Sequence, residues 1–403
     1  MKRLSRLDSN KRDGKLGRIR ASRMGASCRL VMLLAGLSFV IPIAHAGKPV
    51  QPPPPPPPPP PVHYQLTYLD TLGADCDTQA WEMNDLGTIV GTATNTVTGV
   101  SRAVMWMPTG DIFDLNTLNT NATWNDTTGA PAPGWTAAEA ASVNVVNQIV
   151  GRATKTGSPD RAFIYDMATG NFLLLPEVEG QTTVGRVDIN DYGTVAAQVF
   201  GSISGAVVYA PPLFEPLEIL GGAWIRINNL GTITVQSGAV MYPPYSLNQV
   251  NDLGSSGYRI WGLADNADVI SGRFIGTNSK GKNAVPAGPV RLDLTTGSQL
   301  LLSSSSGYTG HDINDQNDMV IWDVNGPRDG IYQDGVGVLA LDNLVVAENP
   351  EWLAAWLQAE QVSALSLTNR GSSGFGAICG VTYEGVYPFV GGQRAFVLLP
   401  QAP

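Results

Sequence analysis

Histidine and cysteine are scarce in this chain of 403 residues, which contains three of each. Beyond residue 46 the histidines are reduced to His63 and His311, and the cysteines to Cys76 and Cys379. A Ser-His-Asp triad or a zinc site built from several histidines therefore has almost no material. Paired carboxylates are the acid-base chemistry that the composition leaves open.

Long hydrophobic runs are also lacking. The longest, LVMLLAGLSFVIPIA from Leu30, is shorter than the ~20 residues that span a bilayer and contains Pro42. A basic stretch precedes it and Ala44-His45-Ala46 follows, which predicts a secretory signal peptide over residues 1–46. We expect export to the cell surface or medium, with the periplasm as an alternative. Whether translation starts at Met1 or Met24 stays open.

Basic charge is low. The chain has 25 Lys and Arg against 34 Asp and Glu, and residues 1–46 hold ten of the former and two of the latter, which leaves 15 against 32 and a net charge of −17. Such a surface repels nucleic acid and anionic lipid. We expect neither a nucleic-acid partner nor membrane insertion of the mature chain.

A run of ten prolines, from Pro52 to Pro61, can only form an extended left-handed helix. Residues 47–63 are therefore predicted to be a stiff spacer. The remainder is predicted to be one domain, residues 64–399, with a short tail at 400–403.

One pattern recurs through that domain: an apolar residue, Asn, a turn and a β-branched run that often ends in Gly. The copies begin at seven positions, spaced 36 to 60 residues apart: Met83, Val143, Ile189, Ile227, Leu263, Ile313 and Leu367. Asn, Asp and Gly suit tight hairpins, and each unit is interpreted as four antiparallel strands. Repeats of this length are typical of a β-propeller.

The segment that begins at Tyr64 resembles a fourth strand without a blade, whereas the last unit ends at its third strand. We therefore predict that residues 64–73 pair with the last blade and close the ring. Residues 64–399 supply 48 residues for each of seven blades. Six blades is the alternative if the degenerate copy at Leu263 is a loop.

Three local features extend this prediction. Cys76 and Cys379 lie near the two sides of the seam, and a disulfide between them or two free thiols are both open. The stretch from Asn116 to Ala141 is predicted to be a long loop. The stretch after Glu348 is predicted to be a short helix capped by Asn349 that covers a blade end.

The repeat resembles that of the bacterial extracellular HAF-repeat proteins. MNDLGTIVG with RAVMW and DIFDLNTL, and VNVVNQIVG with RAFIY, carry the resemblance. The middle copies depart from it, with Ala197 and Val235 where Gly is expected. The resemblance implies a secreted β-propeller and no particular activity.

Residues just before the innermost strands should gather at one mouth of the central channel. The candidate ligand-binding residues are Trp81, Arg186, Trp224, Arg226, Arg259, Trp261 and His311. Aromatic faces and Arg forks suit sugars or carboxylated ligands. The alternative is that the tryptophans pack between blades and that the arginines pair with acidic residues.

Aspartates near the hairpins, such as Asp188, Asp312 and Asp315, are expected from turn chemistry, so no catalytic residue is assigned. No cofactor or metal is predicted. Weak calcium binding is the alternative, and a high-affinity site is not indicated because the acidic residues lack the order of a dedicated calcium-binding loop.

We predict a monomeric binding module, for polysaccharide or a cell-envelope partner, that performs no catalysis. A polysaccharide hydrolase or lyase with carboxylates at the channel mouth and a purely structural surface protein are the alternatives.

Overall fold

The computed structural model describes residues 62–202, 204–219, 222–245, 249–276, 287–302, 308–323, 329–369, 376–383 and 392–401. The chain divides into two units, residues 1–56 and 57–403, and all described residues belong to the second. The predicted signal peptide and the proline run lie outside the described residues.

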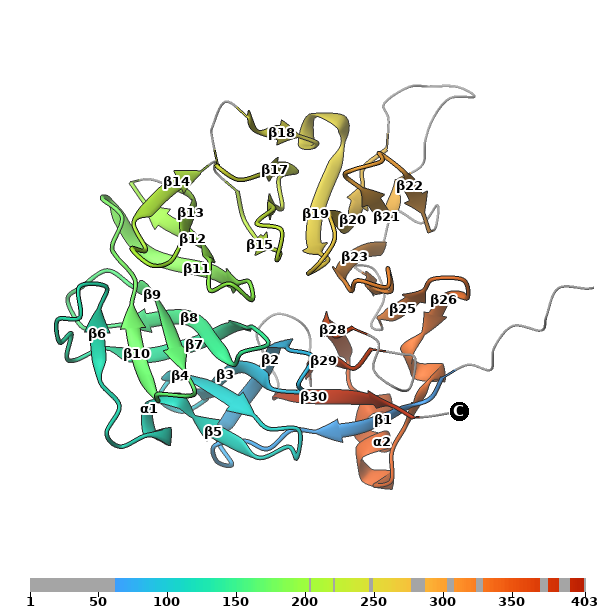
Figure 1. Ribbon diagram of the computed structural model, residues 1–403. Helices are drawn as coiled ribbons and strands as arrows, with labels where there is room; N and C mark the ends of the chain where they lie inside the picture. Colours follow the sequence, from blue (N-terminus) through green and yellow to red (C-terminus); the bar gives the residue numbers. More distant parts are fainter. Residues whose placement is uncertain are drawn as a thin grey trace, which may run out of the picture. The chain divides into compact units, whose positions relative to one another are not determined.

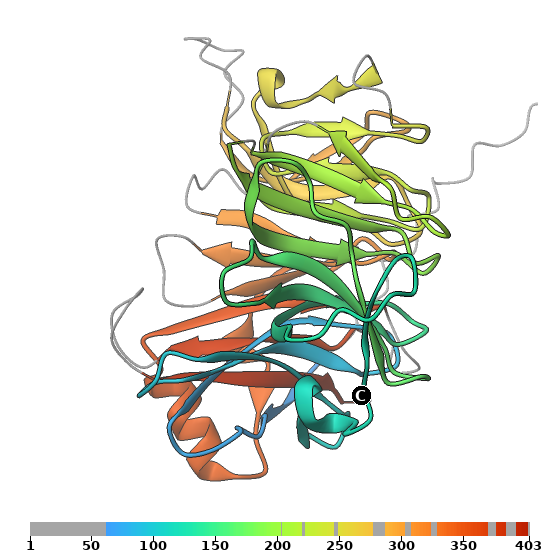
Figure 2. The same cartoon turned by 90° about the vertical axis from the view of Figure 1, so that its left-hand side faces the viewer.

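The chain is a seven-bladed β-propeller. Its sheets are arranged one after another around a central axis. Figure 1 shows the ring of sheets face-on, and Figure 2 shows it from the side. Blades 1 to 4 contain β2 (Cys76–Met83), β3 (Ile89–Asn95), β4 (Ser101–Trp106) and β5 (Ile112–Asp114); β7 (Thr136–Val143), β8 (Gln148–Thr154), β9 (Arg161–Asp166) and β10 (Asn171–Leu174); β11 (Gln181–Ile189), β12 (Val195–Gly201), β13 (Gly205–Tyr209) and β14 (Pro216–Ile219); and β15 (Ile225–Ile227), β16 (Ile233–Val235), β17 (Ala239–Met241) and β18 (Asn251–Asp252).

Blades 5 to 7 complete the ring. They contain β19 (Tyr258–Leu263), β20 (Val269–Phe274), β21 (Gly288–Asp293) and β22 (Gln299–Leu301); β23 (Tyr308–Ile313), β24 (Met319–Asp323), β25 (Gly330–Gln333) and β26 (Gly337–Ala340); and β28 (Gln361–Leu367), β29 (Ile378–Tyr383), β30 (Gln393–Pro400) and β1 (Tyr64–Tyr68). The degenerate copy at Leu263 is a strand pair, β19 with β20, so the prediction of seven blades is confirmed.

The N-terminal strand closes the ring as predicted. β1 pairs antiparallel with β30, from Tyr64 opposite Pro400 to Tyr68 opposite Phe396. The paired strand ends at Tyr68, so it is shorter than the predicted 64–73. A fifth strand that the sequence did not suggest, β27 (Val345–Val346), pairs parallel with the outer edge of β1. The edge that a terminal strand would otherwise expose is therefore covered.

The two long connections both pack against blades. The helix α2 (Pro350–Gln358) begins at the predicted cap, Asn349, and buries Trp356 against Phe396 of β30. It thus packs on the last blade, next to the seam; the prediction was that it covers a blade end. The stretch from Asn116 is only in part a loop, because it contains most of a short helix, α1 (Leu115–Leu118), and a strand, β6 (Trp124–Asp126), that pairs parallel with β10. The stacking of Trp124 on Phe172 stabilises this added strand.

A β-bulge interrupts six of the seven innermost strands. The register against the second strand shifts just before the repeated motif in β2, β7, β11, β19, β23 and β28. The residues at these shifts are Trp81, Ala141, Gly185 with Arg186, Trp261, His311 and Leu365. A bulge places two residues opposite one and redirects their side chains.

The glycine that ends the motif faces this bulge. A Cβ at Gly91 would lie 1.9 Å from the carbonyl oxygen of Gln79, and one at Gly151 would lie 1.8 Å from that of Glu139. Blade 4 carries Val235 at the same place, and its short inner strand pairs with no register shift. In blade 3, where Ala197 replaces the glycine, the shift lies at Gly185 and Arg186, earlier in the inner strand and farther from the motif than in the other bulged blades. The departures from the repeat therefore follow the position of the bulge.

We expect Gly91→Ala to lower the free energy of unfolding by about 2–4 kcal/mol, because the added methyl group collides with backbone that cannot rotate away. Gly73→Ala is the matched control, since a Cβ there meets nothing within 4 Å. Thermal and denaturant unfolding of both variants measures the difference. Equal stabilities would contradict the role assigned to the glycine.

Candidate functional site

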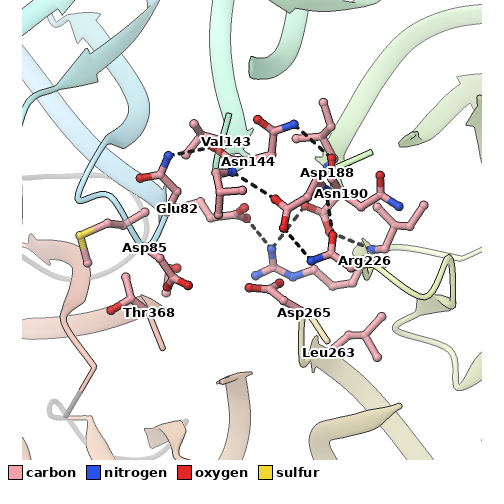
Figure 3. A pocket seen from close by; sticks show the side chains of 18 of the residues that line it. Glu82, Asp85, Val143, Asn144, Asp188, Asn190, Arg226, Leu263, Asp265 and Thr368 are labelled. Carbon is pink, nitrogen blue, oxygen red and sulfur yellow. Dashed lines mark hydrogen bonds and ion pairs between the residues drawn. The ribbon is translucent and has the colours of Figure 1, made fainter. Parts of the chain in front are cut away.

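Each innermost strand runs between two openings of the central channel. The strands end at the hairpins that carry the motif asparagines, and we call this end the asparagine mouth (Figure 3). It is lined by residues that include Glu82, Asp85, Asn144, Asp188, Asp265 and Asp312, around a cavity of about 60 Å³. At the other end lies a larger cavity of about 310 Å³, which we call the tryptophan cavity.

The motif asparagines join neighbouring blades at the first mouth. The Oδ1 of Asn84 accepts N–H groups of its own hairpin, and its Nδ2 donates to the carbonyl oxygen of Asn144 at 2.8 Å. The same contact to the next blade recurs from Asn144, Asn190, Asn228 and Asn314 at 3.0–3.1 Å. The asparagine that suited a turn in the sequence is therefore also a contact between blades.

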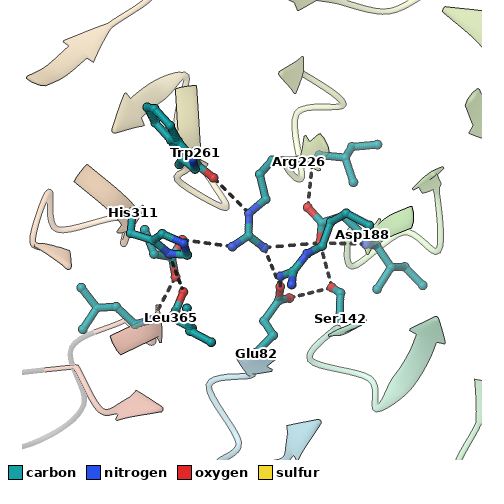
Figure 4. Close-up of polar contacts among 12 residues, drawn as sticks. Glu82, Ser142, Asp188, Arg226, Trp261, His311 and Leu365 are labelled. Atoms are coloured by element: carbon teal, nitrogen blue, oxygen red, sulfur yellow. Dashed lines mark hydrogen bonds and ion pairs between the residues drawn. The ribbon is translucent and has the colours of Figure 1, made fainter. Parts of the chain in front are cut away.

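A cluster of buried charges separates the two openings (Figure 4). Glu82 binds the guanidinium groups of Arg186 at 3.1 Å and Arg226 at 2.6 Å. Arg226 also lies 3.9 Å from Asp188 and 3.7 Å from Asp312. All five side chains are at most 15 % exposed. Removing one partner of a buried ion pair destabilises the folded state, because the other charge is left buried without compensation.

A single hydroxyl group connects two carboxyl groups in this cluster. Ser142 Oγ lies 2.6 Å from Glu82 Oε1 and 2.8 Å from Asp188 Oδ1. A hydroxyl has one proton to donate, so the second short contact needs a proton on a carboxyl group. Burial, and then the charge of Glu82, raise the pKa of Asp188 to about 6. Below about pH 6 we therefore assign the proton to Asp188, which then donates to Ser142, while Ser142 donates to Glu82.

The cluster brings the carboxyl groups of Glu82, Asp188 and Asp312 to the guanidinium groups of Arg186 and Arg226. Burial raises the pKa of Asp312 as well, against the opposing charge of Arg226. The Oδ2 of Asp188 accepts the N–H of Ile227 from blade 4 at 2.9 Å. The cluster therefore joins residues of several blades near the axis of the channel.

Tryptophans from four blades line the larger cavity. They are Trp81, Trp224, Trp261 and Trp322, and His311, Gln361, Ser363 and Tyr383 complete much of the wall. Four of the bulged residues, Trp81, Trp261, His311 and Leu365, line this cavity. The guanidinium group of Arg186 lies 5.3 Å from the ring of Trp224 and 5.9 Å from that of Trp81. It thus stacks behind the aromatic wall.

His311 is a neutral part of this wall. Burial, followed by the charges of Arg226 and Arg186, lowers the pKa of His311 to about 3. Its Nδ1 bonds to the carbonyl oxygen of Leu365 at 3.2 Å, so this nitrogen carries the proton. The ring packs edge-on against Trp224, with centroids 5.2 Å apart.

Two buried donors of the wall have no partner in the described part of the chain. They are the indole Nε1–H groups of Trp224 and Trp322. A buried donor without an acceptor is costly, and such groups are rare in folded proteins. An acceptor supplied by a ligand or by water would remove that cost.

The predicted site residues divide between the two openings. Trp81, Trp224, Trp261 and His311 line the tryptophan cavity as a group. Arg186 lies behind the wall, and Arg226 lines the asparagine mouth. Both guanidinium groups are bound by carboxylates, which is the pairing with acids that the sequence analysis gave as the alternative.

Arg259 lies outside both cavities. Its guanidinium group donates to the carbonyl oxygens of Ser237 and Tyr258. The sequence analysis also missed Trp322, which lies in the second strand of blade 6 opposite Thr309. An aromatic residue nine positions after the start of the motif was the available signal.

Cys76 and Cys379 are both free, so of the two possibilities that the sequence left open the structure has two free thiols. Cys379 packs in the cluster between blades 7 and 1, together with Ala80.

Within the described residues, no group of three or more His, Cys, Asp or Glu side chains could hold a metal ion. The helices of that part of the chain are all too short or too polar to cross a membrane.

No protein-family model matches the chain, and no curated protein matches it. Solved structures of other propellers do. A streptogramin B lyase is 11 % identical, with a TM-score of 0.52 over 84 % of this chain and 98 % of that one. An oligogalacturonate lyase in complex with manganese is 10 % identical, with a TM-score of 0.48 over 85 % of this chain and 97 % of that one.

The extracellular domain of a hybrid two-component system from B. thetaiotaomicron is 9 % identical, with a TM-score of 0.47 over 83 % of this chain and 40 % of that one. At these identities the likeness concerns the fold alone.

We expect the stability of the protein to fall between about pH 4 and about pH 6 through Asp188. The folded state keeps the proton up to a pKa of about 6, whereas the unfolded chain loses it near 3.8, so rising pH favours unfolding across this range. Asp188→Asn imitates the protonated form and removes this loss.

Denaturant unfolding of both proteins at about pH 4 and about pH 8 tests this assignment. Relative to the wild type, the variant should gain up to about 3 kcal/mol between the two conditions. Ser142→Ala should lower the stability at both, because it removes the shared hydroxyl. A stability difference between Asp188→Asn and the wild type that does not change with pH would refute the shared proton.

Proposed function

We propose that the protein is an exported binding module that takes a neutral carbohydrate in the tryptophan cavity. The observation that carries the proposal is the wall of four tryptophans around about 310 Å³. Flat aromatic faces pack against the apolar faces of sugar rings, and a few polar groups orient the hydroxyls. Gln361, Ser363 and the Nε1–H groups of Trp224 and Trp322 are the polar groups available.

The charge of the cavity favours a ligand without charge. Asp329 is the one carboxyl group among the described residues that line it, and its oxygens accept the N–H groups of Ala364 and Asp323. Burial raises the pKa of Asp329 well above its ordinary value, which favours the neutral form. Arg186 is the adjacent cation, and Glu82 already binds it. A uronic acid would find no free partner here.

The two alternatives receive less support. A glycoside hydrolase needs two facing carboxyl groups, and the tryptophan cavity offers Asp329 alone among its described residues. Carboxyl groups do gather at the asparagine mouth, but that cavity holds only about 60 Å³ and Arg226 occupies its floor. A purely structural protein would need no cavity, so the aromatic wall favours a binding role over it.

Titration of intrinsic tryptophan fluorescence with neutral oligosaccharides and with oligogalacturonate tests the proposal. We expect saturable binding of at least one neutral sugar and none of the acidic one. Trp224→Ala or Trp322→Ala should weaken that binding at least about tenfold. Trp224→Phe keeps the ring but removes the donor, so it should have a smaller effect.

Trp135→Ala is the matched control, because Trp135 lies against Lys155 and Arg161 and does not line the cavity. Failure of every neutral sugar to bind would contradict the proposal. Cleavage of a sugar during the titration, followed by chromatography, would favour the hydrolase or lyase.

A further inference from the structure

The hairpin tips around the asparagine mouth carry exposed apolar residues on four successive blades. These residues, Leu86, Val146, Tyr192 and Leu230, form what we call the apolar arc. They are 58, 59, 73 and 53 % exposed in that order. Each follows a residue that lines the mouth, namely Asp85, Val145, Asp191 and Asn229. The arc therefore borders that opening along blades 1 to 4.

The turn itself does not require these apolar residues. In blade 1 the hairpin is made by Asn84, whose carbonyl accepts the N–H of Gly87, and by the positive φ of 82° at Gly87. Leu86 stands between them and points to solvent. Blade 6 has Gln316 at the same place and blade 5 has Asn266, so the chain itself provides polar versions of the tip. Exposed apolar residues at equivalent positions indicate a contact surface, whereas single scattered ones do not.

The opening inside the arc is acidic, and its one described cation, Arg226, is held by Glu82, Asp188 and Asp312. Asp85 and Asp315 accept hydrogen bonds from the neutral groups of Asn369 and Asn266, and Asp191 accepts from Asn229. No described arginine or lysine pairs with these three carboxylates or with Asp265. Desolvation, and then the charges of Asp315 and Asp312, raise the pKa of Asp265, although this residue is exposed at the surface of the opening. A cation placed in the mouth would relieve this crowding.

We propose that this face binds a partner protein that inserts one lysine or arginine side chain into the asparagine mouth and packs apolar neighbours of that side chain on the apolar arc. The space fits this occupant, because about 60 Å³ accepts a cationic head group and not a folded segment. Apolar anchors around a desolvated charge pair are the usual composition of a binding hot spot.

Other occupants fit the charge less well. A second copy that docked through the same face would bring two acidic openings together. An anionic bilayer would be repelled by the same carboxylates. The proposal concerns the end of the channel opposite the tryptophan cavity, so it stands or falls independently of sugar binding.

A set of short synthetic peptides tests the proposal by fluorescence anisotropy. The set combines a central Arg or Glu with apolar or Ser flanks. We expect the peptide with both Arg and apolar flanks to bind at least about tenfold more tightly than the other three. Equal binding of the four, preference for Glu, or no binding of any peptide would overturn the proposal.

Two variants locate the binding. The triple change Leu86→Gln, Tyr192→Gln and Leu230→Gln copies the tip of blade 6, so it should fold normally and lose most of the binding. Asp265→Asn should weaken binding of the Arg peptide and leave binding of the Glu peptide unchanged. The matched control is Val97→Gln with Ile275→Gln, two exposed residues that follow β3 and β20 at the far ends of the hairpins.

Thermal unfolding first establishes that the variants are folded. An Arg peptide that binds the triple variant as tightly as the wild type would refute the assigned surface. Sedimentation of the wild type and the triple variant tests whether the arc binds a second copy of the chain. A wild-type dimer that the triple change dissociates would show that the occupant is a second copy and would overturn the proposal. Binding to anionic phospholipid vesicles that the triple change abolishes would likewise overturn it.

Discussion

The bulge in the innermost strands is the constraint on which the rest of this propeller depends. Without it, side chains would alternate regularly between the two faces of each blade. The register shift at Trp81, Trp261 and His311 redirects these rings toward one end of the channel, while the next residue in blades 1 and 6, Glu82 or Asp312, lies toward the other. The bulge requires the motif glycine on the facing strand, because a Cβ at that position would collide with the backbone of the innermost strand.

The buried charges then give the two ends of the channel different chemistry. Glu82 engages both Arg186 and Arg226, so neither guanidinium group is free to meet a ligand on the aromatic side. The tryptophan cavity is left apolar and nearly without charge, whereas the carboxylates beyond Arg226 leave the asparagine mouth acidic. One ring can therefore present two unrelated binding surfaces, since ligand sites are determined by side chains and not by the fold.

Part of this site followed from the sequence because of where its residues stand in the repeat. Trp81, Trp224, Trp261 and His311 lie just before the motif, and equivalent positions of a propeller meet at its axis. Arg226 and Arg259 occupy similar positions but were misplaced, since the sequence does not tell which carboxylate or carbonyl oxygen each guanidinium group will reach. Trp322 was missed because it lies on the second strand, whereas the prediction considered the residues just before the motif on the innermost strands.

The sequence by itself determined the repeat, the strand order and the closure by the N-terminal strand, because hairpin chemistry and strand periodicity are local and repeat along the chain. Tertiary structure decided between six and seven blades, which blades share a hydrogen bond, where the register shifts and which carboxyl groups surround each guanidinium group. These depend on distances of a few ångströms between residues tens to hundreds of positions apart, such as Glu82 and Arg226. The repeat leaves such distances open, and the closed ring fixes them.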